Sequence, residues 1–118
     1  MSAKHLEATV RRVSGVAVID LRGDIDGTAE QALNSAYAEA SANGSASVLL
    51  NFGGVGYINS TGIALIVGVL AQARKAKRHI STFGLSEHYT EIFQITRLAD
   101  FMGIYPDEAS ALSQQASG

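Results

Sequence analysis

Cysteine is absent from this sequence, long apolar runs are missing, and neither sign of charge dominates. The lack of cysteine excludes disulfides, thiolate metal ligands and a cysteine nucleophile, and it fits a reducing compartment. The longest apolar stretch, residues 63–73, is interrupted by Gly68 and Gln72 and is far shorter than the ~20 residues of a membrane-spanning helix. With a formal net charge of −2, the chain as a whole is not suited to binding a polyanion.

A signal-peptide core is missing as well, because the first seven residues contain no apolar run. We therefore expect a soluble cytoplasmic protein that does not contact a membrane. The 118 residues are 47% apolar and 17% charged, which is typical of one globular domain. No repeat, low-complexity segment or linker divides the chain. We expect a single domain over residues 1–118, with a frayed tail at about residues 113–118.

Signals for β-structure come first along the chain. Leu6, Ala8 and Val10 alternate with polar residues as on a half-buried strand, and residues 16–21 predict a more buried strand. Ser14-Gly15 between them indicates a turn. The pair predicts an antiparallel hairpin.

The middle of the chain alternates helix and strand. A helix is predicted over residues 28–43, begun by a capping box of Thr28 and Gln31 and ended by Gly44. Residues 47–52 predict a strand that is covered on both faces. After the glycine-rich residues 53–58, a second helix is predicted from about Ser60 to Lys77.

The last third repeats this order on a smaller scale. Residues 79–83 predict a strand, and Ser86 can cap a third helix. Residues 103–105 predict a short last strand, and Pro106-Asp107 open a terminal helix that includes Leu112. Helices that alternate with buried strands imply an α/β domain, with a mixed sheet of four to five strands and about four helices packed on it.

Three groups of residues resemble functional motifs without matching them. Residues 53–56 follow a strand as phosphate-binding glycines do, but their spacing fits no nucleotide motif, so backbone turning or close packing explains them better. The basic run at residues 74–79 complements the end of a helix dipole and has no interleaved aromatic residues, so we expect no direct nucleic-acid binding. His5, His79 and His88 lack metal-ligand spacing, and the residues around Ser60 do not match the elbow of serine hydrolases.

Two further features each have two interpretations. Asp24 and Asp26 fall in an expected strand-to-helix connection, where they could form a turn or, if they converged on one pocket, perform acid–base chemistry. The second helix is apolar nearly all round. Either it is fully buried, or its surplus near Ser60 is exposed and marks a partner surface.

The most informative residues are Asn59-Ser60-Thr61-Gly62, where the apolar strand is expected to lead into the second helix. A hydroxyl at the start of a helix can cap it. A helix N-terminus also suits a phosphate, because free N–H groups and the helix dipole favour negative charge. The two hydroxyls are therefore a cap, an anion contact or a target for phosphorylation.

Residues 48–63 (VLLNFGGVGYINSTGI) resemble the signature of the STAS-domain family, specifically of the bacterial anti-sigma factor antagonists: a strand, a turn, Asp-Ser-Ser/Thr-Gly and a helix. Residues 23–26 (GDID) resemble that family's Gly-Glu-Leu-Asp segment, and the order of elements agrees from about Leu6 to Leu112. The resemblance implies an interaction module that is not an enzyme and has no cofactor. In that family a kinase that is also the anti-sigma factor phosphorylates the serine, the unphosphorylated antagonist binds that kinase and frees the sigma factor, and a PP2C-type phosphatase reverses the modification.

By position, the resemblance implies that Ser60 is the phosphorylated residue, with Thr61 as the alternative. Asp26, Asn59 and Gly62 would be its neighbours, with Gly62 permitting a tight entry to the helix. We expect partner contacts at Asp24, Asp26, Ser60 and Ile63. The apolar helix face would serve a partner or a second copy of the chain equally well, so the sequence leaves a homodimer open.

Asn59 departs from the family, whose antagonists usually carry Asp there. Asparagine keeps the capping and hydrogen-bonding ability but loses a charge, which bears on how the switch operates. Two alternatives therefore stay open: a STAS scaffold or regulatory subunit without a phosphorylation cycle, and a small nucleotide- or anion-binding protein that uses the glycine-rich residues and Asp26.

Overall fold

The computed structural model describes residues 5–42, 44 and 46–117, with side chains described as far as residue 114. In that part of the chain, five strands form one mixed sheet in the order β1-β2-β3-β4-β5. β1 (Glu7–Val13) is antiparallel to β2 (Val16–Ile25), which confirms the predicted hairpin. β3 (Ser47–Ile58), β4 (His79–Phe83) and β5 (Gly103–Tyr105) run parallel to β2.

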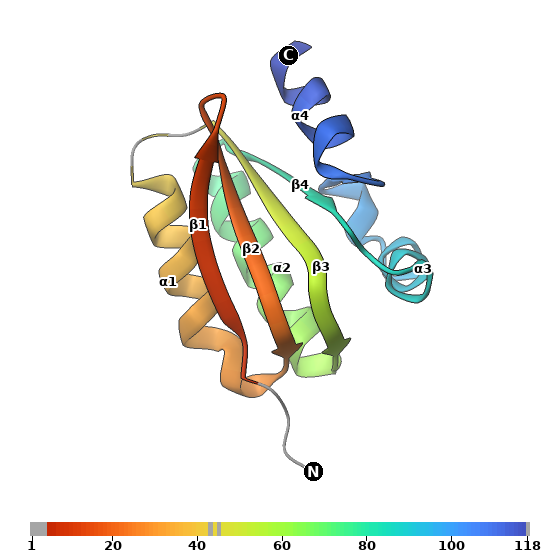
Figure 1. Ribbon diagram of the computed structural model, residues 1–118. Coiled ribbons are helices and arrows are strands. Elements are labelled where there is room, and N and C mark those ends of the chain that lie inside the picture. Colours follow the sequence, from red (N-terminus) through yellow and green to blue (C-terminus); the bar gives the residue numbers. More distant parts are fainter. Residues whose placement is uncertain (1–4, 43, 45, 118) are drawn as a thin grey trace.

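Helices cover both faces of this sheet. α1 (Glu30–Ser41) and α2 (Ser60–Lys75) lie behind β1–β3 in Figure 1, and α4 (Glu108–Ser117) packs on the other face. α3 (Glu87–Ile95) follows β4, and the short 3-10 helices η1 (Gly27–Ala29) and η2 (Leu98–Asp100) precede α1 and β5. The arrangement confirms the predicted α/β fold with its mixed sheet. Among the described residues, no helix is both long and apolar enough to cross a membrane.

Two apolar cores follow from the alternation of side chains along β2 and β3. The larger lies between the sheet and α1 and α2, and it includes Leu50. Phe93 of α3 extends it by packing edge-on against Phe52, with ring centroids 5.8 Å apart. The smaller core lies under α4 and consists of Val18, Leu49, Phe83 and Ala111. Because neighbours such as Leu49 and Leu50 enter different cores, residues 47–52 are apolar on both faces, as the sequence predicts.

The glycine-rich residues 53–58 differ most from the prediction, because they continue β3. Gly54 lies so close to β2 that a Cβ atom there would come within 2.9 Å of the Leu21 carbonyl oxygen. The β2–β3 ladder shifts register at two places on either side of this approach. Close packing of two irregular strands, rather than a turn, therefore explains the glycines. β2 is also longer than predicted and ends at Ile25, so Asp24 is a strand residue and not part of a connection.

The start of α1 corrects a second prediction. The capping box of Thr28 and Gln31 does not form: Asp26 caps η1 by accepting the Thr28 N–H at 2.9 Å, and Ala29 at the N-cap of α1 makes no side-chain capping bond. A carboxylate is a stronger acceptor than a hydroxyl, which favours Asp26 as the cap. Gly44, the predicted stop, does adopt a left-handed φ of +72°, but α1 has already ended at Ser41.

The other helix ends differ by a few residues. α2 ends at Lys75, because Lys77 adopts a left-handed φ of +59° and the Arg78 N–H bonds back to the Ala73 carbonyl at 2.8 Å. α2 is buried on one side only, and Val67 is 45% exposed, so the interpretation of full burial is wrong. α4 continues to Ser117, past residue 113 where a tail was predicted.

Candidate functional site

The Asn59–Gly62 segment lies at the carboxyl ends of β2 and β3, where the first turn of α2 meets the end of β2 (Figure 1). Ile25 pairs with Ile58 at the end of the ladder, and the Asn59 N–H donates to the Ile25 carbonyl at 3.2 Å. The carboxyl ends of parallel strands are the edge at which α/β folds carry their sites. The sequence motif therefore falls where such a fold can present it.

Asn59 is the residue that caps α2. Its side-chain oxygen accepts the Gly62 N–H at 2.8 Å, and its carbonyl accepts the Ile63 N–H at 2.9 Å. Asn59, and not a hydroxyl, therefore caps the helix. An anion contact and a target for phosphorylation remain as interpretations of the two hydroxyls. Ser60 and Thr61 stand exposed in the first turn of the helix.

Gly62 sets how closely α2 approaches β2. A Cβ atom on this buried glycine would lie 1.9 Å from the Ile25 carbonyl oxygen and 2.7 Å from its carbon. Any side chain at this position would push the first turn of α2 away from the strand. The position of Ser60 relative to the sheet therefore depends on a glycine two residues later.

Asp26 is the capping residue that immediately precedes η1. Its Oδ1 atom accepts the Thr28 hydroxyl at 2.6 Å and the Thr28 N–H at 2.9 Å. The hydroxyl bond first, and then the backbone bond, lower the pKa of Asp26, so the group is a carboxylate at neutral pH. A Cβ atom on Gly27 would lie 3.6 Å from Thr61 Cγ2, which places η1 directly against the start of α2.

Asp24 contacts a different neighbour. It is half-buried in β2, pairs opposite Tyr57, and its Oδ1 atom lies 3.6 Å from the position of a Cβ atom on Gly56. Asp26 is instead turned to Thr28. The two carboxylates therefore lie at the same edge of the molecule, but Asp24 lies beside β3 whereas Asp26 bonds to η1.

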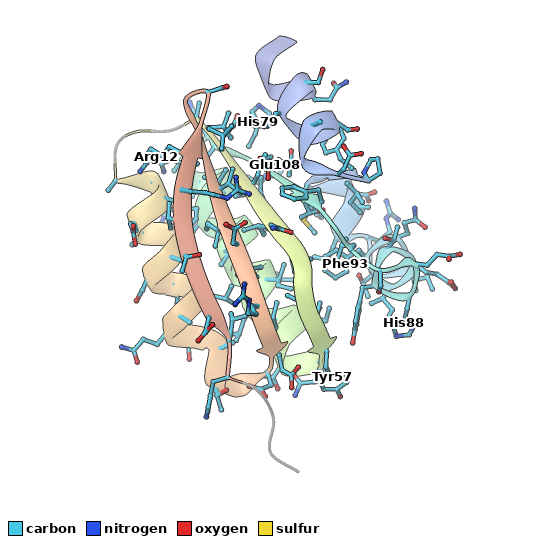
Figure 2. All side chains as sticks on the ribbon, in the orientation of Figure 1. Arg12, Tyr57, His79, His88, Phe93 and Glu108 are labelled. Carbon is cyan, nitrogen blue, oxygen red and sulfur yellow. The ribbon has the colours of Figure 1, made fainter. Side chains whose placement is uncertain are left out.

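Tyr57 is the residue of this edge that the sequence analysis missed. Its side chain is 53% exposed at the tip of β3 (Figure 2), whereas the next residue, Ile58, is buried. The signal was the alternation of side chains along a strand, which was lost because the predicted strand ended at residue 52. Ile63, a predicted contact residue, is half-buried against the larger core and offers only part of its surface.

The side chains exposed at this edge carry hydroxyl, carboxylate and aromatic groups. In residues 5–42, 44 and 46–117, no group of three or more His, Cys, Asp or Glu side chains could hold a metal ion. Residues 53–56 lie within β3, so they form no loop at a helix N-terminus that could cradle a phosphate. The edge offers an exposed hydroxyl at a helix N-terminus, an exposed aromatic ring at the end of β3 and two carboxylates at the end of β2.

Comparisons with known proteins agree with this architecture. The family model described as STAS domain matches residues 7–111. The chain is 28% identical over 86 residues to the anti-sigma-B factor antagonist of Staphylococcus epidermidis, a match that covers 73% of this chain and 80% of that protein. Its fold resembles that of an anti-sigma factor antagonist from Mycobacterium paratuberculosis, with a TM-score of 0.79 and 19% identity over 92% of both chains.

The fold is also similar to that of the anti-sigma factor antagonist SpoIIAA, whose structure is known in two forms. The unphosphorylated form gives a TM-score of 0.70 with 17% identity and covers 94% of this chain and 98% of SpoIIAA. The phosphorylated form of the Bacillus protein gives a TM-score of 0.68 with 20% identity and covers 91% of this chain and 97% of SpoIIAA. At these identities the structural likeness establishes the fold.

Proposed function

The chain belongs to the STAS domain family, and from that membership we propose that it is an anti-sigma factor antagonist controlled by phosphorylation at Ser60. In its unphosphorylated form it binds a cytoplasmic anti-sigma factor that is also a serine kinase, and a PP2C-type phosphatase regenerates this form. The names of its relatives support the general role. The observation that carries the proposal is the exposed Ser60 hydroxyl, on a helix whose capping position is occupied by Asn59.

The docking surface of the unphosphorylated form is the edge around Ser60. Tyr57 supplies the exposed aromatic ring, which is the residue type that most often anchors protein interfaces. Asp24 and Asp26 give the edge negative charge, and Ile63 adds a partly exposed apolar contact. A partner that fits this surface presents an apolar pocket with basic groups beside it.

Phosphorylation requires no catalytic group from this chain. The Ser60 Oγ atom attacks the γ-phosphorus of ATP held by the kinase, the bond to the bridging oxygen breaks, and ADP leaves while the hydroxyl proton passes to a base of the kinase. The residue is accessible because it lies in the exposed first turn of α2. The chain is thus a substrate and a ligand.

The phosphate can be held locally with little change in the fold. It carries about −1.5 to −2 charges and would lie at the positive end of the α2 dipole. The N–H groups of Ser60 and Thr61 precede those of Gly62 and Ile63, which Asn59 already satisfies. The neutral amide of Asn59 adds no repulsion toward the phosphate, whereas an aspartate there would.

Release of the partner follows from charge. The phosphate adds to the negative charge of Asp24 and Asp26 at the same edge. The partner's basic groups lie opposite Asp24 and Asp26, so where its surface brings acidic groups or a nucleotide phosphate close to Ser60, the new phosphate meets no counter-charge and the partner is repelled. An unpaired charge buried at an interface costs about 2–5 kcal/mol, which is enough to dissociate a complex of moderate affinity.

A second candidate function keeps the STAS fold but has no phosphorylation cycle. The observation that favours it is Asn59, which removes the carboxylate that related antagonists carry next to the acceptor serine. In that case the edge around Tyr57 would bind a partner constitutively. Phosphate on Ser60 in protein isolated from its own cells separates the two functions.

The direct experiment incubates the chain with its kinase and ATP and locates the phosphate by mass spectrometry. We expect one phosphate on Ser60, none on the Ser60→Ala variant, and full incorporation in Thr61→Ala, which removes the neighbouring hydroxyl from the same turn. Equal incorporation into Ser60→Ala would show that the acceptor is assigned wrongly. In a pull-down, Ser60→Ala should bind the kinase and Ser60→Glu should not.

A further inference from the structure

The last part of β3 has a neighbouring strand on one side only. β3 pairs with β2 as far as Ile58, whereas its pairing with β4 ends at Asn51, because β4 stops at Phe83. In the part of the chain that the structure describes, no strand therefore lies against residues 52–58 on the β4 side. α3 follows β4 and lies on this side of β3 (Figure 1).

The Ile58 N–H points to the side on which β4 has ended. Successive N–H groups of a strand point in opposite directions within the sheet. The Asn59 N–H donates to the Ile25 carbonyl of β2, so the N–H before it is directed away from β2. It donates to the Tyr89 hydroxyl of α3 at 2.9 Å. The hydroxyl thus replaces the carbonyl that a longer β4 would offer.

The donor of this hydrogen bond is a buried backbone group. Ile58 is only 6% exposed, and a buried N–H without an acceptor is costly. Phe52, Val55, Leu85 and the half-buried Tyr89 line a cavity of about 10 Å³ beside it, which leaves little space for water to take the place of the hydroxyl. Tyr89 therefore supplies the acceptor that the end of β3 needs.

α3 holds this tyrosine against β3. Tyr89 and Phe93 are four residues apart, so they lie on one face of the helix, and Figure 2 shows Phe93 on the side that faces β3. Phe93 packs on Phe52, while Tyr89 bonds to Ile58 at the end of the strand. Ser86 accepts the Tyr89 N–H at 3.2 Å and so caps the first turn of α3. The helix supports the part of β3 that lacks β4.

The bond to Tyr89 lies two residues before Ser60. The residue between them, Asn59, caps α2 by accepting the Gly62 N–H at 2.8 Å. On the other side, the Ile25 carbonyl of β2 accepts the Asn59 N–H at 3.2 Å. The turn that carries Ser60 is therefore fixed from two sides, by β2 and by α3.

We propose that Tyr89 is a positioning residue for the phosphorylation of Ser60. This role rests on the proposed function, and Tyr89 acts in it through Ile58 and Asn59. Phosphoryl transfer depends on placing the attacking oxygen in line with the leaving group. By holding the end of β3, the Tyr89 hydroxyl keeps the Ser60 Oγ atom in one position relative to the surface on which the kinase docks.

The kinetics of phosphorylation are the first readout, with Tyr89→Phe as the variant that removes the hydroxyl and keeps the ring. We expect kcat to fall roughly tenfold, because a small displacement of the attacking oxygen is costly. KM should change by less than about twofold, because Asp24 and Asp26 at the docking surface are unchanged. Circular dichroism measures the folded fraction, and a loss of folded protein alone would lower kcat only by the unfolded fraction.

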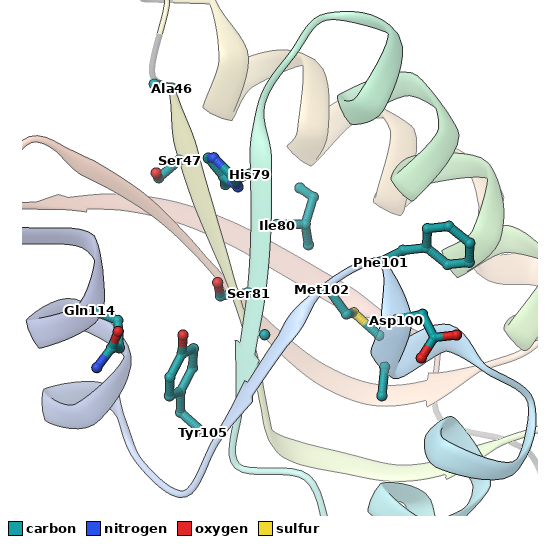
Figure 3. Close-up of a pocket in the computed structure, with 12 residues that line it drawn as sticks. Ala46, Ser47, His79, Ile80, Ser81, Asp100, Phe101, Met102, Tyr105 and Gln114 are labelled. Atoms are coloured by element: carbon teal, nitrogen blue, oxygen red, sulfur yellow. The ribbon is translucent and has the colours of Figure 1, made fainter. Parts of the chain in front are cut away.

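Tyr105→Phe is the matched control. Tyr105 is a half-buried tyrosine of β5 that packs against the smaller core under α4. It lines a cavity of about 650 Å³ together with Gln114 of α4 (Figure 3). Removing its hydroxyl should leave both kcat and KM as in the wild-type chain.

Amide exchange in the isolated chain tests the positioning without a kinase. In Tyr89→Phe, the Ile58 amide should exchange roughly tenfold faster, because it loses its acceptor. The Gly62 amide should also exchange faster, because its acceptor Asn59 is the next residue along the chain. The Leu50 amide lies where β4 still pairs with β3, so its exchange should change by less than about twofold.

The inference is overturned if Tyr89→Phe keeps the kcat of the wild-type chain, if Tyr105→Phe lowers kcat equally, or if the Gly62 amide exchanges at its original rate. Equal acceleration at Leu50 would also overturn it, because the hydroxyl would then stabilise the whole fold. If the wild-type chain takes up no phosphate on Ser60, the proposed function fails. The Gly62 amide then decides by itself whether Tyr89 orders this turn.

Discussion

Replacing Gly62 by alanine should destabilise the protein, although alanine is the better helix former. The new Cβ atom would lie 1.9 Å from the Ile25 carbonyl oxygen, more than 1 Å inside the closest approach of about 3.0 Å that real side chains show. The obstructing atoms belong to the backbone of β2, so they cannot turn aside. The first turn of α2 must move instead, and the bond from Gly62 to the Asn59 side chain is strained with it.

The expected cost combines three terms. Overpacking costs about 1–3 kcal/mol, and loss of a helix cap costs about 1 kcal/mol. The higher helix propensity of alanine offsets about 1 kcal/mol of this. We therefore expect the free energy of unfolding to fall by about 1–3 kcal/mol, measured by urea denaturation and far-UV circular dichroism.

Gly68 provides the matched control on the same helix. It is exposed, and a Cβ atom there would meet nothing within 4 Å. Gly68→Ala should therefore raise stability by about 0.5–1 kcal/mol. If the two variants differ by less than about 1 kcal/mol, the close approach of α2 to β2 is not what fixes the first turn, and the reasoning about Ser60 fails.

Other contacts give three shorter predictions. Asn59→Ala should cost about 1 kcal/mol in the same urea titration, because the Gly62 N–H loses its acceptor, whereas Asn59→Asp should keep the cap. The hydrogen bonds of the Arg11 guanidinium lower the pKa of both Asp20 and Glu108. These two carboxylates therefore stabilise the fold at pH values above the ordinary pKa of about 4, and this stabilisation is lost as the pH falls through their lowered pKa values. Wild-type protein should accordingly lose more stability between neutral and acid pH than Glu108→Gln does. Tyr37→Phe should be neutral or stabilise by about 1 kcal/mol, since the buried Tyr37 hydroxyl has no partner among the described residues; a clear loss in thermal unfolding would reveal one.

Local signals explain why much of the fold could be predicted. The strand at residues 79–83 and the cap at Ser86 depend on neighbouring residues, and both lie where the sequence places them. The apolar residues 47–52 indicated a strand covered on both faces. The structure agrees, because side chains of this segment contribute to both apolar cores. The start of the second helix at Ser60 was likewise readable from the Asn59–Gly62 motif.

What could not be predicted depends on contacts between distant residues. The glycines at residues 53–56 were consistent with either backbone turning or close packing, and nothing local showed that Gly54 would lie against β2 within a continued strand. The extension of β3 in turn determines that the Tyr57 side chain is exposed near the end of the strand that leads into α2. Arg11 bonds to Glu108, 97 residues away, and no sequence period marks that pair.

The central claim is that a phosphate on Ser60 switches partner binding. The most direct measurement is the affinity of the partner anti-sigma factor for this chain before and after stoichiometric phosphorylation, with Ser60→Ala treated in parallel. We predict that phosphorylation weakens binding roughly a hundredfold or more, as an unpaired interfacial charge requires, and that the treated Ser60→Ala variant binds as the unmodified chain does. Equal affinities for the two forms of the wild-type chain would contradict the account.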